Sequence, residues 1–141
     1  MVIRLRSGEN EIEPPKEGYS TEPPFKKLLR MENITEVHDF KIYNEHGSIA
    51  FLNPVDLTQA DLGSFVISQR GVSAFEDCEQ PPAPGKGLNQ PARIVLKCVK
   101  PPKNKSAEQY GIKLQKSLEK DRATFVSYTS DFVWTFEVPS F

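Results

Sequence analysis

The end of the chain alternates between large apolar side chains and other residues in the pattern of a β-strand. The apolar positions recur at every second residue: Phe132, Trp134, Phe136 and Val138. Because successive side chains of a strand point to opposite faces, this period predicts a strand with one face packed on a core. The run stops at Phe141, the last residue of the sequence, which leaves two interpretations: a deliberate truncation, or an end with chemical meaning.

Length and charge narrow the classes of protein to consider. The 141 residues suit one domain with a sizeable core. Apolar residues make up 38%, charged residues 26%, and the net charge is -1. Such a chain has no overall field that would draw it to nucleic acid or to an anionic membrane. We therefore expect neither as a direct partner.

The cysteines and the N-terminus indicate a reducing compartment. Cys78 and Cys98 are far apart in sequence, with no CxxC motif and no histidine pair at ligand spacing. Neither a zinc site nor a disulfide framework is expected, and no motif for another metal or a cofactor stands out. Residues 1–10 lack the apolar stretch of a signal peptide, and no run is long enough to span a membrane. The prediction is a soluble protein of the cytosol or nucleus.

The pattern along the chain predicts a charged lead-in followed by one mostly β domain. Residues 1–17 show no apolar period and are expected to be extended or disordered, and 18–141 form the domain. Helices are expected at 25–31 and, after an N-cap at Ser106, through about Arg122. Extended segments are expected at 18–24, 38–44, 48–52, 64–76 (with a bend at Gly71), 92–99, 124–128 and 132–138. The fold class is mostly β or α+β, a sandwich or half-open barrel of about six strands flanked by two helices.

The sequence contains little evidence for common enzyme chemistry. A hydrolase would need Cys78 or Cys98 beside a histidine, and no spacing brings them together; Cys98, in a strand, is expected to be core. The acidic neighbours of Cys78 also disfavour a reactive thiolate. The segment 85–89, Gly-Lys-Gly-Leu-Asn, has glycines and a lysine but not the spacing of a phosphate-binding loop. From these residues alone, a binding module is the best interpretation.

A series of short motifs adds a family resemblance. In order they are Gly-Tyr-Ser-Thr-Glu-Pro at 18–23, Gly-Ser-Ile-Ala-Phe at 47–51, Asn-Pro-Val-Asp-Leu at 53–57, the 85–89 loop, Tyr-Gly-Ile-Lys-Leu at 110–114, and the ending at 133–141. Their order resembles the C-terminal autoproteolytic domain of the GLFG-repeat nucleoporin of ninety-eight kilodaltons and its homologues. The resemblance covers 18–141 and is carried by the order of the motifs together with the final phenylalanine.

The resemblance implies a single self-cleavage. Members cut themselves after the phenylalanine of a His-Phe-Ser sequence, where the serine hydroxyl attacks the preceding carbonyl carbon. Phe141 then corresponds to the residue before the cleavage point, and Ser140 takes the position of the family histidine. Asn89 is a candidate donor to the developing oxyanion, although it can equally well organise its own loop. No turnover enzyme is implied.

Ser140 is the departure from the family pattern. General-base help is worth about 10² to 10⁴ in rate, so cleavage by this sequence is expected to be slow or absent. Three accounts stay open: an engineered replacement of histidine, a natural member that cuts weakly or not at all, or cleavage through another base. We favour the natural member that cuts weakly or not at all.

The resemblance also implies anchoring at the nuclear pore complex in the nucleus. Relatives use this domain to dock Phe-Gly repeats onto scaffold nucleoporins, including a β-propeller nucleoporin, and so serve protein and mRNA transport. The site at the end of the domain is expected to bind either its own downstream C-terminal peptide or a loop of a partner. The alternative is an unrelated β-rich adaptor domain without processing chemistry.

Overall fold

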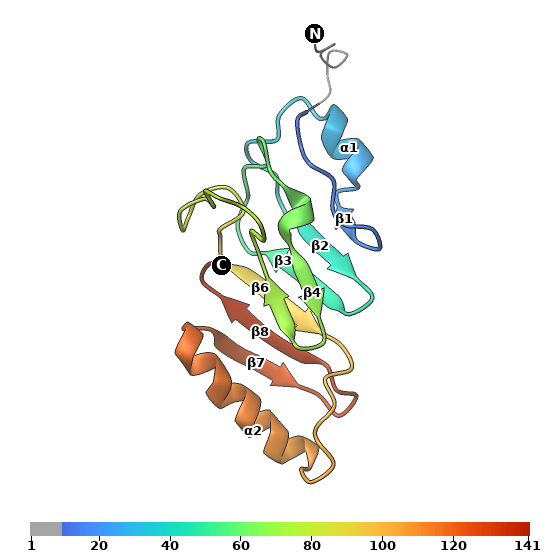
Figure 1. Ribbon diagram of the computed structural model, residues 1–141, viewed down its shortest axis with the longest axis vertical. Helices are drawn as coiled ribbons and strands as arrows, with labels where there is room; N and C mark the ends of the chain where they lie inside the picture. Colours follow the sequence, from blue (N-terminus) through green and yellow to red (C-terminus); the bar gives the residue numbers. More distant parts are fainter. Residues whose placement is uncertain (1–9) are drawn as a thin grey trace.

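Eight strands in two sheets form the framework of the molecule, which the computed structural model describes over residues 10–141 (Figure 1). Six of them form one antiparallel sheet in the order β1-β2-β3-β6-β8-β7. Their bounds are Ser20–Glu22 (β1), Lys41–Asn44 (β2), Gly47–Phe51 (β3), Ala92–Leu96 (β6), Thr124–Tyr128 (β7) and Trp134–Val138 (β8). The sheet is open, with β1 and β7 at its edges.

Two helices lie at opposite ends of this sheet. Helix α1, Phe25–Arg30, lies beside β1, and helix α2, Ala107–Leu118, packs along β7 (Figure 1). Short 3₁₀ turns occur at Leu62–Ser64 (η1) and Glu119–Asp121 (η2). The predicted class, mostly β or α+β with two helices, is confirmed. Residues 10–141 contain eight strands instead of about six, and the two additional strands form a small hairpin that the sequence did not predict.

That hairpin replaces a segment that was expected to be continuously extended. Residues 64–76 contain the end of η1 and then β4, Val66–Ser68, paired antiparallel with β5, Gly71–Ser73. The chain reverses at Gln69 and Arg70, a dipeptide without the Asn or Gly that marks most two-residue turns. Gly71 follows with a φ of 152°, so the predicted bend lies at the start of the second strand.

Strand β8 occupies an interior position between β6 and β7, which explains its apolar alternation. Trp134 pairs with Leu96 of β6, and Phe136 pairs with Ile94, so the large side chains share one face with the core. Trp134 and Phe136 are both buried, whereas Phe132 lies in the preceding turn with a φ of 66°. The strand therefore begins at Trp134, two residues later than predicted.

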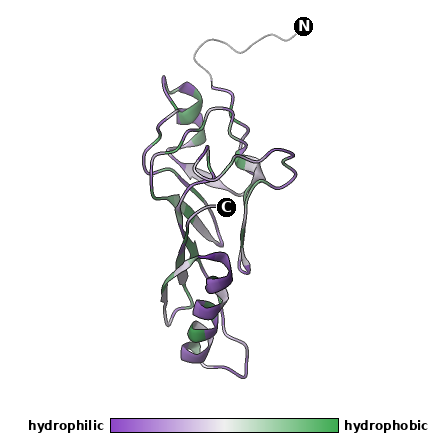
Figure 2. Ribbon diagram, turned by 90° about the vertical axis from the view of Figure 1, so that its left-hand side faces the viewer, coloured by the Kyte–Doolittle hydropathy of each residue, from purple (hydrophilic) through white to green (hydrophobic). Residues whose placement is uncertain are grey.

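Helix α2 begins where the sequence predicted. Ser106 accepts a hydrogen bond from the Gln109 backbone N–H, and the Gln109 side chain accepts one from the Ser106 N–H, which completes a capping box. The regular helix ends at Leu118 and continues as η2 to Asp121, and Arg122 then adopts a left-handed conformation with a φ of 56°. In Figure 2 the ribbon of α2 is mostly hydrophilic, as expected of a helix that buries one side only.

The lead-in predicted for 1–17 lies partly outside the described residues. From residue 10 the chain is extended and packs on the domain: Ile12 is buried, and the Asn10 side chain donates to the carbonyls of Leu28 and Met31 at the end of α1. The Glu13 N–H donates to the Ala60 carbonyl at 2.9 Å. Residues 10–17 are thus held by the fold although they form little regular structure. Within residues 10–141, neither helix is long and apolar enough to cross a membrane.

Candidate functional site

The side chain of Phe141 lies in a seat formed by two buried phenylalanines. Its ring centroid is 6.0 Å from that of Phe51 and 5.9 Å from that of Phe65, with interplanar angles of 54° and 84°. Phe51 stands at the end of β3 and Phe65 directly after η1. Both distances fall in the range of favourable aromatic pairs, and the near-perpendicular contact with Phe65 is the edge-to-face arrangement. Phe141 itself is half-buried.

Two further aromatic rings pack against the phenylalanines that form the seat. Phe40 stacks on Phe51 with centroids 5.8 Å apart, and Phe75 contacts Phe65 edge-on at 5.5 Å. Phe51 and Phe65 also contact each other, at 6.4 Å. Phe40 and Phe65 are fully buried. Because close-packed interiors leave little room for rearrangement, the seat is a preformed part of the core.

Asn89 holds the main chain of the same residue. The backbone N–H of Phe141 donates to Asn89 Oδ1 at 2.6 Å, and Asn89 Nδ2 donates to the Pro82 carbonyl at 2.9 Å. Asn89 is only 4% exposed, so both halves of its amide need partners and have them. Phe141 is therefore held at two points, by its ring and by its N–H.

The loop at 80–89 is folded around Asn89. Its N–H donates to the Lys86 carbonyl at 2.9 Å, and its carbonyl accepts from the Gly85 N–H at 2.7 Å. Gly85 and Gly87 have φ values of 87° and 54°, a region that glycine enters without strain. These contacts give the loop a defined conformation. The amide nitrogen of Asn89 is engaged with Pro82, so its assignment as an oxyanion donor stays a prediction.

A groove runs from Ser140 and Phe141 across the face of β8. It has a volume of about 620 Å³ and lies between the β4–β5 hairpin and the end of α2. Its lining includes Arg70, Val72, Leu118, Trp134, Phe136, Ser140 and Phe141. Ser140, the predicted position of the family histidine, is half-buried in this lining. Among the described residues the lining contains no histidine, since His38 and His46 both lie elsewhere.

The hairpin beside the groove is anchored to the main sheet through one residue. The Ile67 N–H donates to the Tyr19 hydroxyl at 2.9 Å, and the Ile67 carbonyl accepts from Asn44 Nδ2 at 3.0 Å. Ile67 is buried on β4, so these two side chains satisfy both of its backbone groups. Sequence reasoning singled out neither Tyr19 nor Asn44 for this role. The motif at 18–23 contains Tyr19, but nothing in its neighbourhood indicates the contact.

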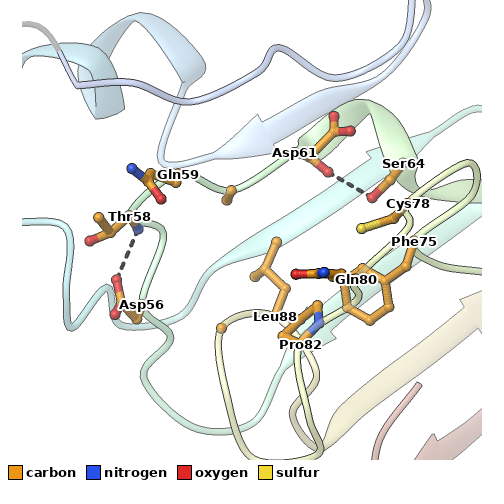
Figure 3. A pocket seen from close by; sticks show the side chains of 12 residues that line it. Asp56, Thr58, Gln59, Asp61, Ser64, Phe75, Cys78, Gln80, Pro82 and Leu88 are labelled. Carbon is orange, nitrogen blue, oxygen red and sulfur yellow. Dashed lines mark hydrogen bonds between the residues drawn. The ribbon is translucent and has the colours of Figure 1, made fainter.

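A separate pocket of about 270 Å³ has Phe75 in its lining (Figure 3). Phe75, Pro82 and Leu88 supply its apolar surface. The carboxylates at its rim accept hydrogen bonds from backbone N–H groups two residues away. Asp56 accepts from the Thr58 N–H at 2.9 Å, and Asp61 Oδ1 accepts from the Gly63 N–H at 3.0 Å. The lining therefore mixes polar and apolar side chains, and these two carboxylates serve the turns in which they lie.

The two cysteines lie at the surface, outside the regular strands. Cys78 and Cys98 are both free and exposed, and Cys98 follows the end of β6 with a φ of 56°. The expectation of a core cysteine in a strand at 92–99 was therefore wrong for Cys98, because β6 ends at Leu96. Within residues 10–141, no cluster of three metal-ligating side chains occurs.

One tyrosine has an altered acidity. Burial, with a smaller contribution from Tyr110, raises the pKa of the Tyr128 hydroxyl above its usual value. The hydroxyl donates to the Val99 carbonyl, and the two tyrosine rings meet edge-on with centroids 6.0 Å apart. This contact joins α2 and β7 to the segment after β6, so its role is structural.

Comparison with known proteins places these features in a family context. The family model described as Nup98-96 autopeptidase S59 matches residues 16–141. The chain is 33% identical over 140 residues to the nuclear pore complex protein NUP98A of Arabidopsis thaliana, an alignment that covers 87% of this chain and 13% of that protein. The chain thus spans only a small part of the length of this curated relative.

Two solved structures are similar in fold. One is a mutant of the Chaetomium thermophilum Nup145N APD fused to Nup145C N, with a TM-score of 0.75 and 30% identity, covering 87% of this chain and 94% of that chain. The other belongs to the yeast heterotrimeric Nup82-Nup159-Nup116 nucleoporin complex, with a TM-score of 0.74, covering 89% of this chain and 97% of that chain. At 21% identity, the second shows the fold alone.

Proposed function

This chain belongs to the Nup98-96 autopeptidase S59 family, and we propose that it is the folded anchoring domain of a nuclear pore protein, with a cleavage position at Phe141. Nuclear pore localisation is supported by the relative NUP98A, a nuclear pore complex protein. Family membership sets aside the alternative of an unrelated adaptor. The anchoring domain serves transport by fixing Phe-Gly repeats, attached on its N-terminal side, to scaffold nucleoporins.

The observation that carries the cleavage proposal is the two-point hold on Phe141. Its ring lies against Phe51 and Phe65, and its N–H donates to Asn89. A residue fixed at both side chain and main chain presents its carbonyl group in one orientation. Such positioning supplies a large part of the rate enhancement in intramolecular reactions.

The reaction is an acyl shift followed by hydrolysis. A hydroxyl oxygen on the residue after Phe141 attacks the Phe141 carbonyl carbon, and a base takes the hydroxyl proton. The C–N bond breaks, the leaving nitrogen receives a proton, and an ester replaces the amide. One water then hydrolyses the ester. Phe141 keeps the new carboxylate, and the released fragment begins with the hydroxyl residue.

Ser140 makes this reaction slow. A serine hydroxyl holds its proton too tightly to act as a general base near neutral pH, whereas a histidine at this position has the right acidity. The absence of that help lowers the rate by about 10² to 10⁴. We favour a natural member of the family that cuts weakly or not at all, rather than an engineered replacement or a substitute base.

The groove beside Phe141 is the proposed docking site. It is continuous with the cleavage position and has apolar side chains along β8, namely Trp134 and Phe136. The proposed occupants are the downstream peptide and, in competition with it, a loop of a scaffold nucleoporin such as a β-propeller nucleoporin. The similar Chaetomium domain was crystallised as a mutant fused to Nup145C N, so that domain keeps this fold with a further segment attached. Competition between the peptide and the partner in a pull-down would test shared use of the groove.

The cleavage proposal is tested by intact mass. The chain is expressed with a tail added after Phe141 that begins with serine, beside a Ser140→His version with the same tail. A third version carries Ser140→His with alanine directly after Phe141. We expect rapid cutting only in the second version. Cutting of all three would exclude the hydroxyl as nucleophile, and an uncut Ser140→His version would remove self-cleavage and leave the anchoring role.

A further inference from the structure

We propose that α2 and the loop before it form a second docking surface, which binds an acidic peptide segment with a large apolar anchor residue. This surface is separate from the groove beside Phe141, because the linings of the two grooves share no residue. The inference goes beyond the proposed function and does not depend on cleavage or on docking at Phe141.

The charge of the chain is divided unevenly between its parts. Residues 97–122 carry eight lysine and arginine side chains and three carboxylates, a net charge of +5. The remainder of residues 10–141 carries eight lysine and arginine side chains and fifteen carboxylates, a net charge of -7. Residues 97–122 run from the end of β6 to the end of η2 and form the α2 end of the molecule (Figure 1). This end therefore has a positive local potential that the overall charge of -1 conceals.

The basic side chains at this end are accessible and unpaired. Four of the lysines lie in the segment between β6 and α2, and the others are Lys113 and Lys116 on α2 and Lys120 in η2. Lys105 is half-buried, and the other lysines and Arg122 are exposed. Within residues 10–141, no ion pair joins any of them to a carboxylate. A partner can therefore use their charge without breaking an internal ion pair.

An apolar groove lies beside these lysines. It lies between α2 and β7 and has a volume of about 680 Å³, within the range of ligand-binding clefts. Ile112, Phe125 and Tyr128 contribute apolar surface to its lining. Ile112 is 58% exposed, follows one turn after Glu108 on the helix, and precedes Lys116 by one turn. A large side chain of a partner can cover Ile112 here and gain the free energy of apolar burial.

The combination of groove and charge selects the class of partner. A phenylalanine or leucine of an extended peptide fills the groove, and carboxylates next to it in the peptide meet Lys113 and Lys116. Glu108 also lines the groove and repels carboxylates at the start of the helix, so the acidic residues lie toward the two lysines. Single-stranded RNA needs exposed aromatic faces for its bases, whereas Phe125 and Tyr128 are half-buried and packed against the core. The surface therefore fits an acidic peptide better than RNA.

Fluorescence anisotropy with labelled probes of about twelve residues tests the surface, at about 150 mM salt so that distant charges are screened. The main probe has two phenylalanines at its centre and glutamate at every other position. The comparison probes are a peptide of glutamate alone and an oligouridine RNA of the same length. We expect the main probe to bind about 5- to 10-fold more tightly than the glutamate peptide, because its rings bury apolar surface in the groove.

Three variants locate the contact. Lys113→Glu with Lys116→Glu reverses the charge beside the groove, and Ile112→Ser removes its apolar wall. Lys26→Glu with Lys27→Glu is the matched control, because both of these exposed lysines lie on α1 at the opposite end of the sheet. For the main probe we expect a loss of affinity of about 10-fold or more from the first variant and about 3- to 10-fold from Ile112→Ser. The control should change the affinity by less than about 2-fold.

Urea unfolding checks that each variant is folded, and glutamine at 113 and 116 replaces glutamate if the charge-reversed chain is not. Losses confined to the variants on α2 establish the surface. Equal binding of the main probe and the glutamate peptide overturns the role of the groove, and equal losses from the α1 and α2 lysine pairs show only non-specific attraction. Tighter binding of the RNA than of the peptide, or no binding of the main probe up to about 1 mM, also overturns the proposal.

Discussion

Replacing Asn89 by alanine isolates the hydrogen bonds that hold Phe141 and the loop at 80–89. The substitution removes the acceptor for the Phe141 N–H, 2.6 Å away, and the donor to the Pro82 carbonyl, 2.9 Å away. Asn89 is 4% exposed, so water does not fully replace either contact. Gln90→Ala is the matched control, because the Gln90 side chain bonds the Gly85 carbonyl of the same loop at 2.8 Å but at the surface.

The expected cost follows from the burial of the partners. A buried group left without its hydrogen bond costs about 1–3 kcal/mol, and the lower part of this range applies because Phe141 and Pro82 are each half-buried. Two such groups give about 2–4 kcal/mol for Asn89→Ala. The control loses one exposed hydrogen bond and should cost about 0.5 kcal/mol or less.

Equilibrium urea unfolding measures the difference. With a urea dependence of about 2 kcal/mol per M, the midpoint of Asn89→Ala should fall by about 1–2 M, and that of Gln90→Ala by about 0.25 M or less. An unchanged slope of the unfolding free energy against urea concentration would show that the native and unfolded states keep their compactness. A midpoint for Asn89→Ala equal to that of Gln90→Ala would refute the two-point hold on Phe141.

Two further predictions concern the framework. A Cβ added at Gly47 would lie 2.0 Å from the Val95 carbonyl oxygen across the β3–β6 pair, so Gly47→Ala should lower the free energy of unfolding by about 3 kcal/mol or more. Gly18→Ala is the control: no atom lies within 4 Å of its new Cβ, and the φ of 87° alone should cost about 1 kcal/mol. The midpoints of urea unfolding measure both effects. For Tyr128 the pKa is raised in the folded state, so its contribution to stability is complete below pH 10.0 and is lost as the pH rises through the folded value. The free energy of unfolding should therefore decrease less steeply with pH above 10.0 in Tyr128→Phe than in the unchanged chain. The same slope in both chains would contradict the raised pKa of Tyr128.

The elements with strong local signals were predictable from the sequence. The alternation at β8 reflects burial of one face, and the capping box at Ser106 satisfies backbone groups within its own turn. Both signals depend on near neighbours in the chain. The hairpin at Gln69 and Arg70 was missed because its turn residues carry no such signal, and its position is fixed by Tyr19 and Asn44 from elsewhere in the fold.

The site was predictable only in part, since its members are distant in sequence. Phe141 and Asn89 were named from a family resemblance, and the structure joins them by a hydrogen bond between residues 52 positions apart. Phe51 was noted only as the end of the motif at 47–51, and Phe65 was not named at all. Each looks like an ordinary core phenylalanine in its own segment, and only the tertiary fold shows that both contact the ring of Phe141.

The position of β8 explains how one segment serves both stability and function. An interior strand pairs on both sides, so β8 is held by β6 and β7 and stays in place when residues beyond it change. Only Pro139 and Ser140 separate its last residue from Phe141, and this short connection leaves the ring few positions other than the seat. A cut after Phe141 breaks no contact described for its ring or its N–H. If the proposed cleavage occurs, the domain should therefore keep its fold and the position of Phe141, and the groove proposed as a docking site should keep its shape.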